Sequence, residues 1–233
     1  MPLEFFSLKV GGQKLQGVIH LPKKVPAPVV VGSHGLFSSK DSEKFIMLGD
    51  LFSQEGIAFL RYDHRGCGES EGDISETTPS SRLEDLKGVL AFVRGHPLLD
   101  ASRLGLLGSS MGGFISVLAA KEDPGIKALV LWATPMRIRG KGEGPLREAF
   151  FEDARRFDLL QAVEGLKGCL FLHGKGDEVV PFQDALELYR RAKEPKELVL
   201  FEKADHSFSE LEDRKSAALL SLEWFKRFLL GPS

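Results

Sequence analysis

The sequence predicts an α/β fold in which helices cover both faces of a mostly parallel sheet. Short apolar runs alternate with helical segments along most of the 233-residue chain. Strands that alternate with helices of about 10–15 residues are typical of βαβ units, which place strands parallel. The run at residues 29–31 is continuously β-branched, as expected of a strand buried on both faces. Glycine-rich polar segments follow several of these runs, and ligands of such sheets bind at the carboxyl ends of the strands.

An antiparallel hairpin around Gly11-Gly12 is expected to open the chain, and shorter, more apolar strands to follow it. The expected strands are residues 4–10, 14–21, 29–31, 57–62, 104–107, 126–132, 169–172 and 198–201. The spacing of apolar residues predicts helices at 42–54, 80–94, 114–120, 181–192 and 216–229.

The alternation is interrupted after the expected strand at 126–132. Residues 136–167 contain a helical patch around 146–160 and no clear strand. We interpret this segment as a small lid inserted into a single domain that spans residues 1–233. A solvated helix face is the expectation for its basic residues, and contact with an anionic substrate is the alternative. These basic residues are Arg137, Arg139, Lys141, Arg147, Arg155 and Arg156.

The composition is that of a soluble globular protein, with 42% hydrophobic and 27% charged residues and a net charge of −2. Because acidic and basic residues are mixed, no nucleic-acid partner is expected. Cys67 and Cys169 are too few for a disulfide framework, and whether they meet is left open. No apolar run approaches the ~18 residues of a membrane span, and the start lacks a signal-peptide pattern. A cytoplasmic location is therefore expected.

The most informative motif is G-x-S-x-G at residues 108–112. An apolar run leads into Gly108-Ser109-Ser110-Met111-Gly112, and an apolar helical segment follows at once. Strand, tight turn and helix in this order are the context of a nucleophile elbow, in which a strained turn exposes the serine. We therefore predict that Ser110 is an activated nucleophile.

Two downstream residues are candidates for the partners that such a serine needs. A serine hydroxyl needs an adjacent base, and an imidazole base needs a carboxylate to fix its tautomer. The elbow pattern expects these partners in the order serine, acid, histidine. Asp177 follows the expected strand at 169–172, and His206 follows the one at 198–201. Both lie in loops at carboxyl ends of strands, so we expect them in one cleft with Ser110.

An acyl-transfer site also needs N–H donors for the oxyanion. Met111 would supply one at a helix N-terminus, and Leu36, in the segment His34-Gly35-Leu36, would supply the other. Four apolar residues adjoin these loops and are expected either to line an acyl pocket or to pack in the core. They are Phe37, Trp132, Val179 and Phe208.

Five blocks of sequence, taken together, resemble the α/β-hydrolase superfamily over nearly the full length of the chain. The blocks are Ser33-His34-Gly35, Asp-His-Arg-Gly-Cys-Gly-Glu-Ser at 63–70, the elbow, His173-Gly174-Lys175-Gly176-Asp177 with Val180-Pro181, and Asp205-His206. Within the superfamily, the sequence is similar to small serine esterases that include cinnamoyl (feruloyl) esterases and monoacylglycerol lipases. Serine at the elbow disfavours the dehalogenases and epoxide hydrolases of this fold, which have aspartate there, and the dienelactone hydrolases, which have cysteine.

The resemblance implies an eight-stranded α/β-hydrolase sheet with a short cap after strand six. It also implies Ser110 as nucleophile, Asp177 as acid, His206 as base, and Leu36 and Met111 as oxyanion donors. In the loop at 63–70, a salt bridge between Asp63 and Arg65 is expected beside the oxyanion hole.

The expected function is that of a serine carboxylesterase that cleaves esters of short-chain or aromatic acyl groups through an acyl-enzyme. A small-molecule ester is the expected partner, neither a metal nor an organic cofactor is implied, and a homodimer is left open. A thioesterase or a small peptidase would use the same triad. A non-catalytic binding protein on the same fold is the alternative from a different class.

Overall fold

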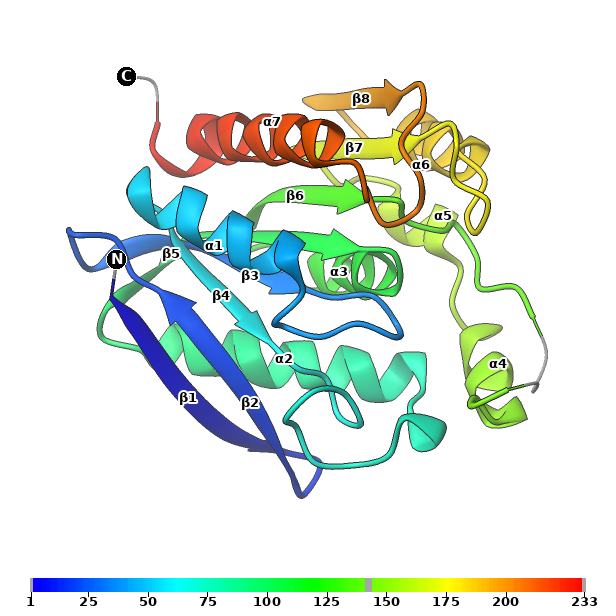
Figure 1. Ribbon diagram of the computed structural model, residues 1–233, viewed down its shortest axis with the longest axis horizontal. Helices are drawn as coiled ribbons and strands as arrows, with labels where there is room; N and C mark the ends of the chain where they lie inside the picture. Colours follow the sequence, from blue (N-terminus) through cyan, green and yellow to red (C-terminus); the bar gives the residue numbers. More distant parts are fainter. Residues whose placement is uncertain (1, 141–143, 232–233) are drawn as a thin grey trace.

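The computed structural model describes residues 2–140 and 144–231. In these residues, eight strands form one sheet in the order β1-β2-β4-β3-β5-β6-β7-β8 (Figure 1). The β1–β2 and β2–β4 pairs are antiparallel, whereas the pairs from β4–β3 to β7–β8 are parallel. The prediction of a mostly parallel sheet with eight strands is therefore confirmed.

The strands are β1 (Leu3–Val10), β2 (Gln13–His20), β3 (Ala27–Ser33), β4 (Ala58–Tyr62), β5 (Leu99–Ser109), β6 (Ile126–Trp132), β7 (Cys169–Gly174) and β8 (Lys196–Phe201). The α-helices are α1 (Glu43–Gln54), α2 (Pro79–Gly95), α3 (Met111–Glu122), α4 (Glu148–Ala154), α5 (Leu159–Val163), α6 (Gln183–Arg191) and α7 (Leu211–Leu229), and a short 3₁₀ helix, η1, spans Ile74–Glu76.

Two boundaries differ informatively from the sequence prediction. Strand β5 starts five residues before the expected 104–107 segment. Leu99 and Asp100 already pair with β3, but the polar residues Asp100, Ser102 and Arg103 interrupt the apolar signal. The helical patch at 146–160 is two helices. Asp158 caps the second of them, since its side chain accepts a hydrogen bond from the N–H of Gln161.

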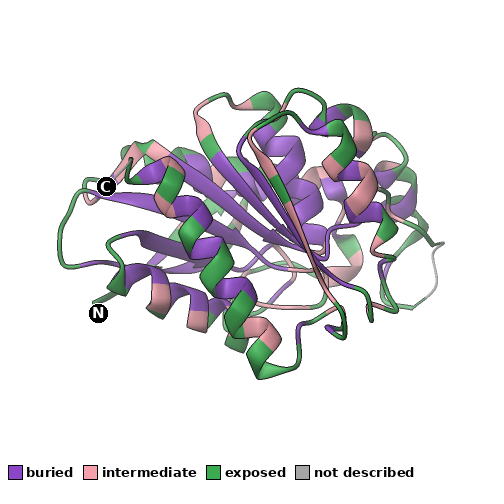
Figure 2. Cartoon of the chain, turned by 90° about the horizontal axis from the view of Figure 1, so that it is seen from above, coloured by how far each residue is buried: buried purple, intermediate pink, exposed green. Residues whose placement is uncertain are grey.

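Helices cover both faces of the sheet. Residues of α2 and α3 pack against one face, and residues of α1 and α7 pack against the other. Figure 2 shows the strands as a buried layer between these helices. The valines of β3 illustrate why a continuous apolar run predicts such a strand: Val29 and Val31 belong to the first core, and Val30 to the second.

The connection between β6 and β7 contains α4 and α5, where the sequence predicted an inserted lid. It is tied to the body of the protein, because the backbone N–H and the hydroxyl of Ser80 donate to the carboxylate of Asp153 at 2.7 and 2.8 Å. Lys141 lies outside the described residues. Figure 1 shows α4 beyond the carboxyl ends of the central strands.

Both cysteines are buried and free, so Cys67 and Cys169 do not pair with each other. No helix among the described residues is long and apolar enough to cross a membrane.

The turn between β5 and α3 depends on close backbone contact with β3. A Cβ atom on Gly112 would lie 1.9 Å from the carbonyl oxygen of Ser33, which belongs to the backbone and cannot rotate away. The glycine therefore lets the start of α3 pass against the end of β3.

Replacing this glycine is expected to destabilise the protein. Gly112→Ala should lower the free energy of unfolding by about 1–3 kcal/mol, as overpacking does in a dense interior, measured by urea denaturation. Gly95→Ala is the matched control, because a Cβ there meets nothing within 4 Å, and its effect should stay within about 1 kcal/mol. Equal stability of the two variants would contradict the expectation.

Candidate active site

Ser110 lies at the turn between β5 and α3, at the carboxyl edge of the sheet. Its backbone has φ 53° and ψ −119°, a region that side-chain-bearing residues rarely adopt and that costs about 1–3 kcal/mol. The N–H of Ser110 donates to the carbonyl oxygen of Trp132 at 2.8 Å. This hydrogen bond and the glycine contacts hold the serine in its strained conformation.

Ser110, His206 and Asp177 form one hydrogen-bonded chain. The Nε2 atom of His206 lies 2.9 Å from the Oγ atom of Ser110, and its Nδ1 atom lies 2.8 Å from Oδ2 of Asp177. An ionised carboxylate only accepts hydrogen bonds, so Nδ1 carries the proton and Nε2 is free to accept the hydroxyl of Ser110. The three residues come from the β5–α3, β7–α6 and β8–α7 connections.

The carboxyl group of Asp177 is fully buried, yet its surroundings favour the ionised form. Burial alone would raise its pKa, but hydrogen bonds from His173, His206 and the backbone N–H of Val180 lower the pKa well below its ordinary value. The N–H groups of Val179 and Val180 donate to Oδ1 at 2.9 and 2.8 Å. Asp177 is therefore an anion in a fixed orientation.

His173 contacts the same carboxylate from β7. Its Nε2 atom lies 3.1 Å from Oδ2 of Asp177 and 2.9 Å from the carbonyl oxygen of Val180. Both neighbours are acceptors, so Nε2 carries a hydrogen. The residue acts as a structural hydrogen-bond donor to Asp177.

The loop after β3 lies against Ser110. A Cβ atom added to Gly35 would be 3.5 Å from Cβ of Ser110. Nδ1 of His34 donates to the carbonyl oxygen of Gly35 at 2.7 Å, and Nη2 of the fully buried Arg82 donates to that of Leu36 at 3.0 Å. Because the C=O and N–H of a trans peptide point in opposite directions, fixing the Gly35 carbonyl also fixes the direction of the Leu36 N–H.

Two backbone N–H groups beside Ser110 remain available. In the described part of the chain, neither the Leu36 N–H nor the Met111 N–H donates to a protein acceptor. Met111 is the first residue of α3, and the first N–H groups of a helix have no partner within it. The sequence predicted both residues as oxyanion donors. It gave no indication that Arg82, 46 residues further along the chain, holds the carbonyl group of Leu36.

Two cavities meet at Ser110. The first, which we call the histidine-side cavity, has a volume of about 390 Å³ and is lined by Gly35, Leu36, Phe37, Ser38, Lys44, Phe45, Ser109, Ser110, Val179, His206 and Ser207. The second, which we call the cap-side cavity, has a volume of about 220 Å³ and is lined by Leu36, Ser110, Met111, Pro135, Arg137, Ile138, Arg139, Leu146, Phe150, Phe151, Val179 and Val180.

The amino-acid sequence matches the model of a known protein family over part of its length. A family model described as serine aminopeptidase, S33, matches residues 24–157, which are more than half of the chain. The chain belongs to this family. The matched segment contains the elbow and the loop after β3, whereas Asp177 and His206 lie beyond it.

Curated relatives of this S33-family chain include the bacterial protein YfhR and the mouse protein ABHD10. YfhR of Salmonella typhimurium is 31% identical over 173 residues, which cover 66% of this chain and 56% of that protein. The chain thus spans little more than half the length of this relative. The mitochondrial palmitoyl-protein thioesterase ABHD10 of mouse is 25% identical over 222 residues, which cover 82% of this chain and 72% of that protein.

Solved structures show the same fold. Est1E from Butyrivibrio proteoclasticus, determined with ferulic acid bound, superposes with a TM-score of 0.83 at 20% sequence identity. The match covers 94% of this chain and 98% of that one. Together with the family match, this similarity confirms the α/β-hydrolase fold and the resemblance to serine hydrolases.

The structure separates the four apolar residues that were expected near the site. Phe37 and Val179 line cavities and are exposed by 67% and 70%. Trp132 and Phe208 line neither cavity. They are fully buried, and their rings pack against each other with centroids 5.0 Å apart. For these two residues, the structure thus favours core packing, the second of the two expected roles, because their side chains pack with α7.

The expected salt bridge between Asp63 and Arg65 is not formed. Arg65 pairs instead with Asp85 of α2, with Nε 2.5 Å from Oδ1. Asp63 accepts hydrogen bonds from the backbone N–H groups of Lys40 and Glu69 at 2.7 and 3.0 Å. The side chain of Arg65 reaches α2, whereas that of Asp63 joins its own loop to Lys40 in the loop between β3 and α1.

Most described basic residues of the expected lid have carboxylate partners. Arg139 makes two hydrogen bonds of 3.0 Å to the buried Asp184. Arg147, Arg155 and Arg156 pair with Glu76, Glu148 and Asp153. The exposed side chains of Arg147, Arg155 and Arg156 agree with the solvated helix face that the sequence predicted, whereas Arg139 is bound to a buried carboxylate.

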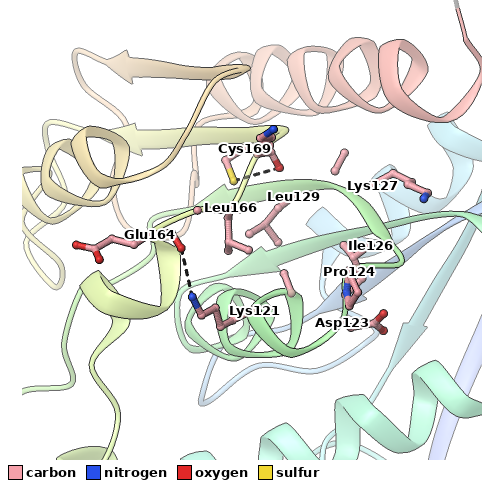
Figure 3. Close-up of a pocket in the computed structure, with 13 residues that line it drawn as sticks. Lys121, Asp123, Pro124, Ile126, Lys127, Leu129, Glu164, Leu166 and Cys169 are labelled. Atoms are coloured by element: carbon pink, nitrogen blue, oxygen red, sulfur yellow. Dashed lines mark hydrogen bonds between the residues drawn. The ribbon is translucent and has the colours of Figure 1, made fainter.

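A larger cavity of about 480 Å³ lies at the opposite edge of the sheet, at the amino ends of β6 and β7 (Figure 3). Lys121, at its mouth, donates to the carbonyl oxygen of Glu164 at 3.4 Å. Cys169 lines it, and burial raises the pKa of this thiol to about 12. The thiol is therefore protonated and unreactive at neutral pH.

The pKa of Asp177 predicts how stability depends on pH. A carboxyl whose pKa is lowered on folding stabilises the protein above its unfolded pKa of about 3.9, and this contribution is lost as the pH falls below that value. Asp177→Asn should therefore be less stable than the wild type at pH 7, and the difference should narrow between about pH 5 and pH 2. Urea denaturation at several pH values in this range measures the difference in the free energy of unfolding between the two proteins.

Ser110→Ala serves as the control for this series, because it leaves the carboxylate and its partners in place. Its pH dependence should follow that of the wild type. A difference between Asp177→Asn and the wild type that stays constant with pH would contradict the lowered pKa.

Proposed function

We propose that this protein is a carboxylic ester hydrolase that works through an acyl-enzyme on Ser110. The observation that carries the proposal is the hydrogen-bonded chain from Oγ of Ser110 through His206 to Asp177, with distances of 2.9 and 2.8 Å. A hydroxyl that donates to an imidazole with an oriented carboxylate behind it is the arrangement that activates a serine.

In the proposed reaction, Oγ of Ser110 attacks the ester carbonyl while Nε2 of His206 takes its proton. Asp177 stabilises the imidazolium that forms, and the N–H groups of Leu36 and Met111 hold the oxyanion. His206 then donates the proton to the departing alcohol. In the second half, the same nitrogen takes a proton from a water molecule, which attacks the acyl-enzyme. The bond between the acyl group and Oγ then breaks, His206 returns the proton to Oγ of Ser110, and the acid departs.

The walls of the cap-side cavity support a small acyl group. Leu146, Phe150 and Phe151 make this side apolar. An apolar cavity of about 150 Å³ already holds a benzene molecule, so about 220 Å³ suits an aromatic or short-chain acyl group. A sixteen-carbon chain would need more room than this cavity has.

Thioester hydrolysis is the second candidate, because the relative ABHD10 is named as a palmitoyl-protein thioesterase. The same three residues would catalyse hydrolysis of a thioester.

Aminopeptidase activity, which the family description suggests, has less support. A free α-amino group is recognised best by carboxylates, and in the described part of the chain no carboxylate lines either cavity. The cytoplasmic location stays a prediction, and whether the protein forms a homodimer stays open.

Labelling by a fluorophosphonate probe tests the nucleophile and separates an enzyme from a non-catalytic binding protein. Mass spectrometry should place the label on Ser110. Ser110→Ala should lose the label and lower kcat/KM for 4-nitrophenyl butyrate by about 10³-fold or more. Ser109→Ala, the neighbouring serine, should still be labelled. An unlabelled wild type, or undiminished turnover by Ser110→Ala, would refute the proposal.

The acyl-chain preference tests the cap-side cavity. Phe151→Ala removes a wall of this cavity, so the ratio of kcat/KM for 4-nitrophenyl decanoate over butyrate should rise several-fold. Phe5→Ala, at a phenylalanine that is 74% exposed on β1, is the control and should leave the ratio unchanged. If folded Phe151→Ala keeps the wild-type ratio, the acyl group does not bind there.

A further inference from the structure

Lys44 places a cation in the histidine-side cavity. It is the second residue of α1, it is half-buried, and it lines this cavity together with Ser110 and His206. Its Nζ atom donates to Oγ of Ser109 at 2.8 Å and lies 5.4 Å from the centre of the Trp132 ring. The ammonium group is thus held one residue away from the candidate nucleophile.

No carboxylate in the described part of the chain pairs with this ammonium group. The buried Lys40 shows the contrast, because its Nζ atom lies within 3.2 Å of three carboxylates, those of Asp41, Asp63 and Glu69. Partial burial of a cation without a counterion is costly, so the position of this ammonium group beside Ser110 points to a ligand that supplies the negative charge.

The charged groups around Lys44 come from three elements. Arg214 of α7 faces it and pairs with Glu43 of α1 at 3.0 Å. Asp205, in the loop before α7, is occupied by the N–H groups of Ser207 and Ser209. Burial and Arg214 lower the pKa of Lys44 to about 8, while Asp205 opposes the shift. Lys44 is therefore mostly protonated at pH 7 and mostly neutral at pH 9.

The position of His206 indicates which part of an ester would meet Lys44. His206 lines the histidine-side cavity and is absent from the lining of the cap-side cavity. In the proposed reaction, His206 delivers the proton to the departing alcohol, so the alcohol part must lie on its side of Ser110. The exposed side chains of Phe37 and Val179 give this cavity apolar walls.

We propose that Lys44 is a specificity-determining residue that binds a carboxylate on the alcohol part of the ester substrate. The proposal rests on the proposed function. A hydroxybenzoate-sized alcohol fits the cavity of about 390 Å³, with its ring between apolar walls and its carboxylate at Nζ of Lys44. Loss of one hydrogen bond between charged groups is expected to lower kcat/KM by about 10–100-fold.

A matched pair of acetate esters tests whether Lys44 binds a carboxylate on the alcohol part. 3-Acetoxybenzoate carries the carboxylate, and 3-acetoxybenzamide is its neutral counterpart. The wild type should prefer the carboxylate ester by about tenfold or more in kcat/KM. Lys44→Met should bring the ratio close to 1 by lowering only the carboxylate rate, whereas Lys44→Arg should keep the preference. Lys215→Met, an exposed lysine of α7, is the control and should keep the wild-type ratio.

The pH dependence gives a second readout. As the pH rises through about 8, Lys44 loses its proton, so the wild-type ratio should fall toward 1 by pH 10. The Lys44→Arg ratio should stay constant, because arginine remains charged throughout this range. A merely structural role of Lys44, such as holding Ser109, would change the rates for both esters together and leave the ratio unchanged.

Inhibition of the wild type by the product alcohols needs no variant and so does not depend on the folding of Lys44→Met. 3-Hydroxybenzoate should inhibit at about tenfold or more lower concentration than 3-hydroxybenzamide. If Ser110 is labelled and the neutral ester is hydrolysed, but neither preference appears, the role of Lys44 is refuted and the proposed function stands. If Ser110 is not labelled and neither ester is hydrolysed, both proposals are refuted.

Discussion

The turn between β5 and α3 is the constraint on which the rest of the site depends. A Cβ atom on Gly108 would lie 2.4 Å from Cα of Gly113, and one on Gly112 would lie 1.9 Å from the oxygen of Ser33. Because the glycines have no Cβ, β5, the turn and α3 pack closely against one another, and Ser110 has a positive φ. Backbone atoms of the core thus fix the turn that carries Ser110.

The loops that build the site around this serine meet at the same edge because the central strands are parallel. The loops after β3, β7 and β8 bring Gly35, Asp177 and His206 to Ser110. The site is polar and mostly buried, so its order depends on satisfied hydrogen bonds. Asp177 holds His206 in one tautomer, and His173 and the backbone in turn hold Asp177.

The two cavities differ in their walls, although the cap-side cavity also includes Arg137, and Arg139, which pairs with Asp184. The cap-side cavity lies under the segment between β6 and β7 and is mainly apolar. The histidine-side cavity contains the ammonium group of Lys44. This difference underlies the proposal that the two parts of an ester bind on opposite sides of Ser110. The acyl side would select by size and the alcohol side by charge.

The sequence by itself determined the local features: the strand–turn–helix that exposes Ser110, and the chain order that placed Asp177 and His206 after strands. Such features depend on neighbouring residues and on the parallel topology, so a pattern reveals them. Only the tertiary structure decided that Trp132 and Phe208 belong to the core, that Arg65 pairs with α2, and that Lys44 pairs with no carboxylate among the described residues. The surroundings of a side chain come from elements far apart in the sequence, and no local pattern encodes them.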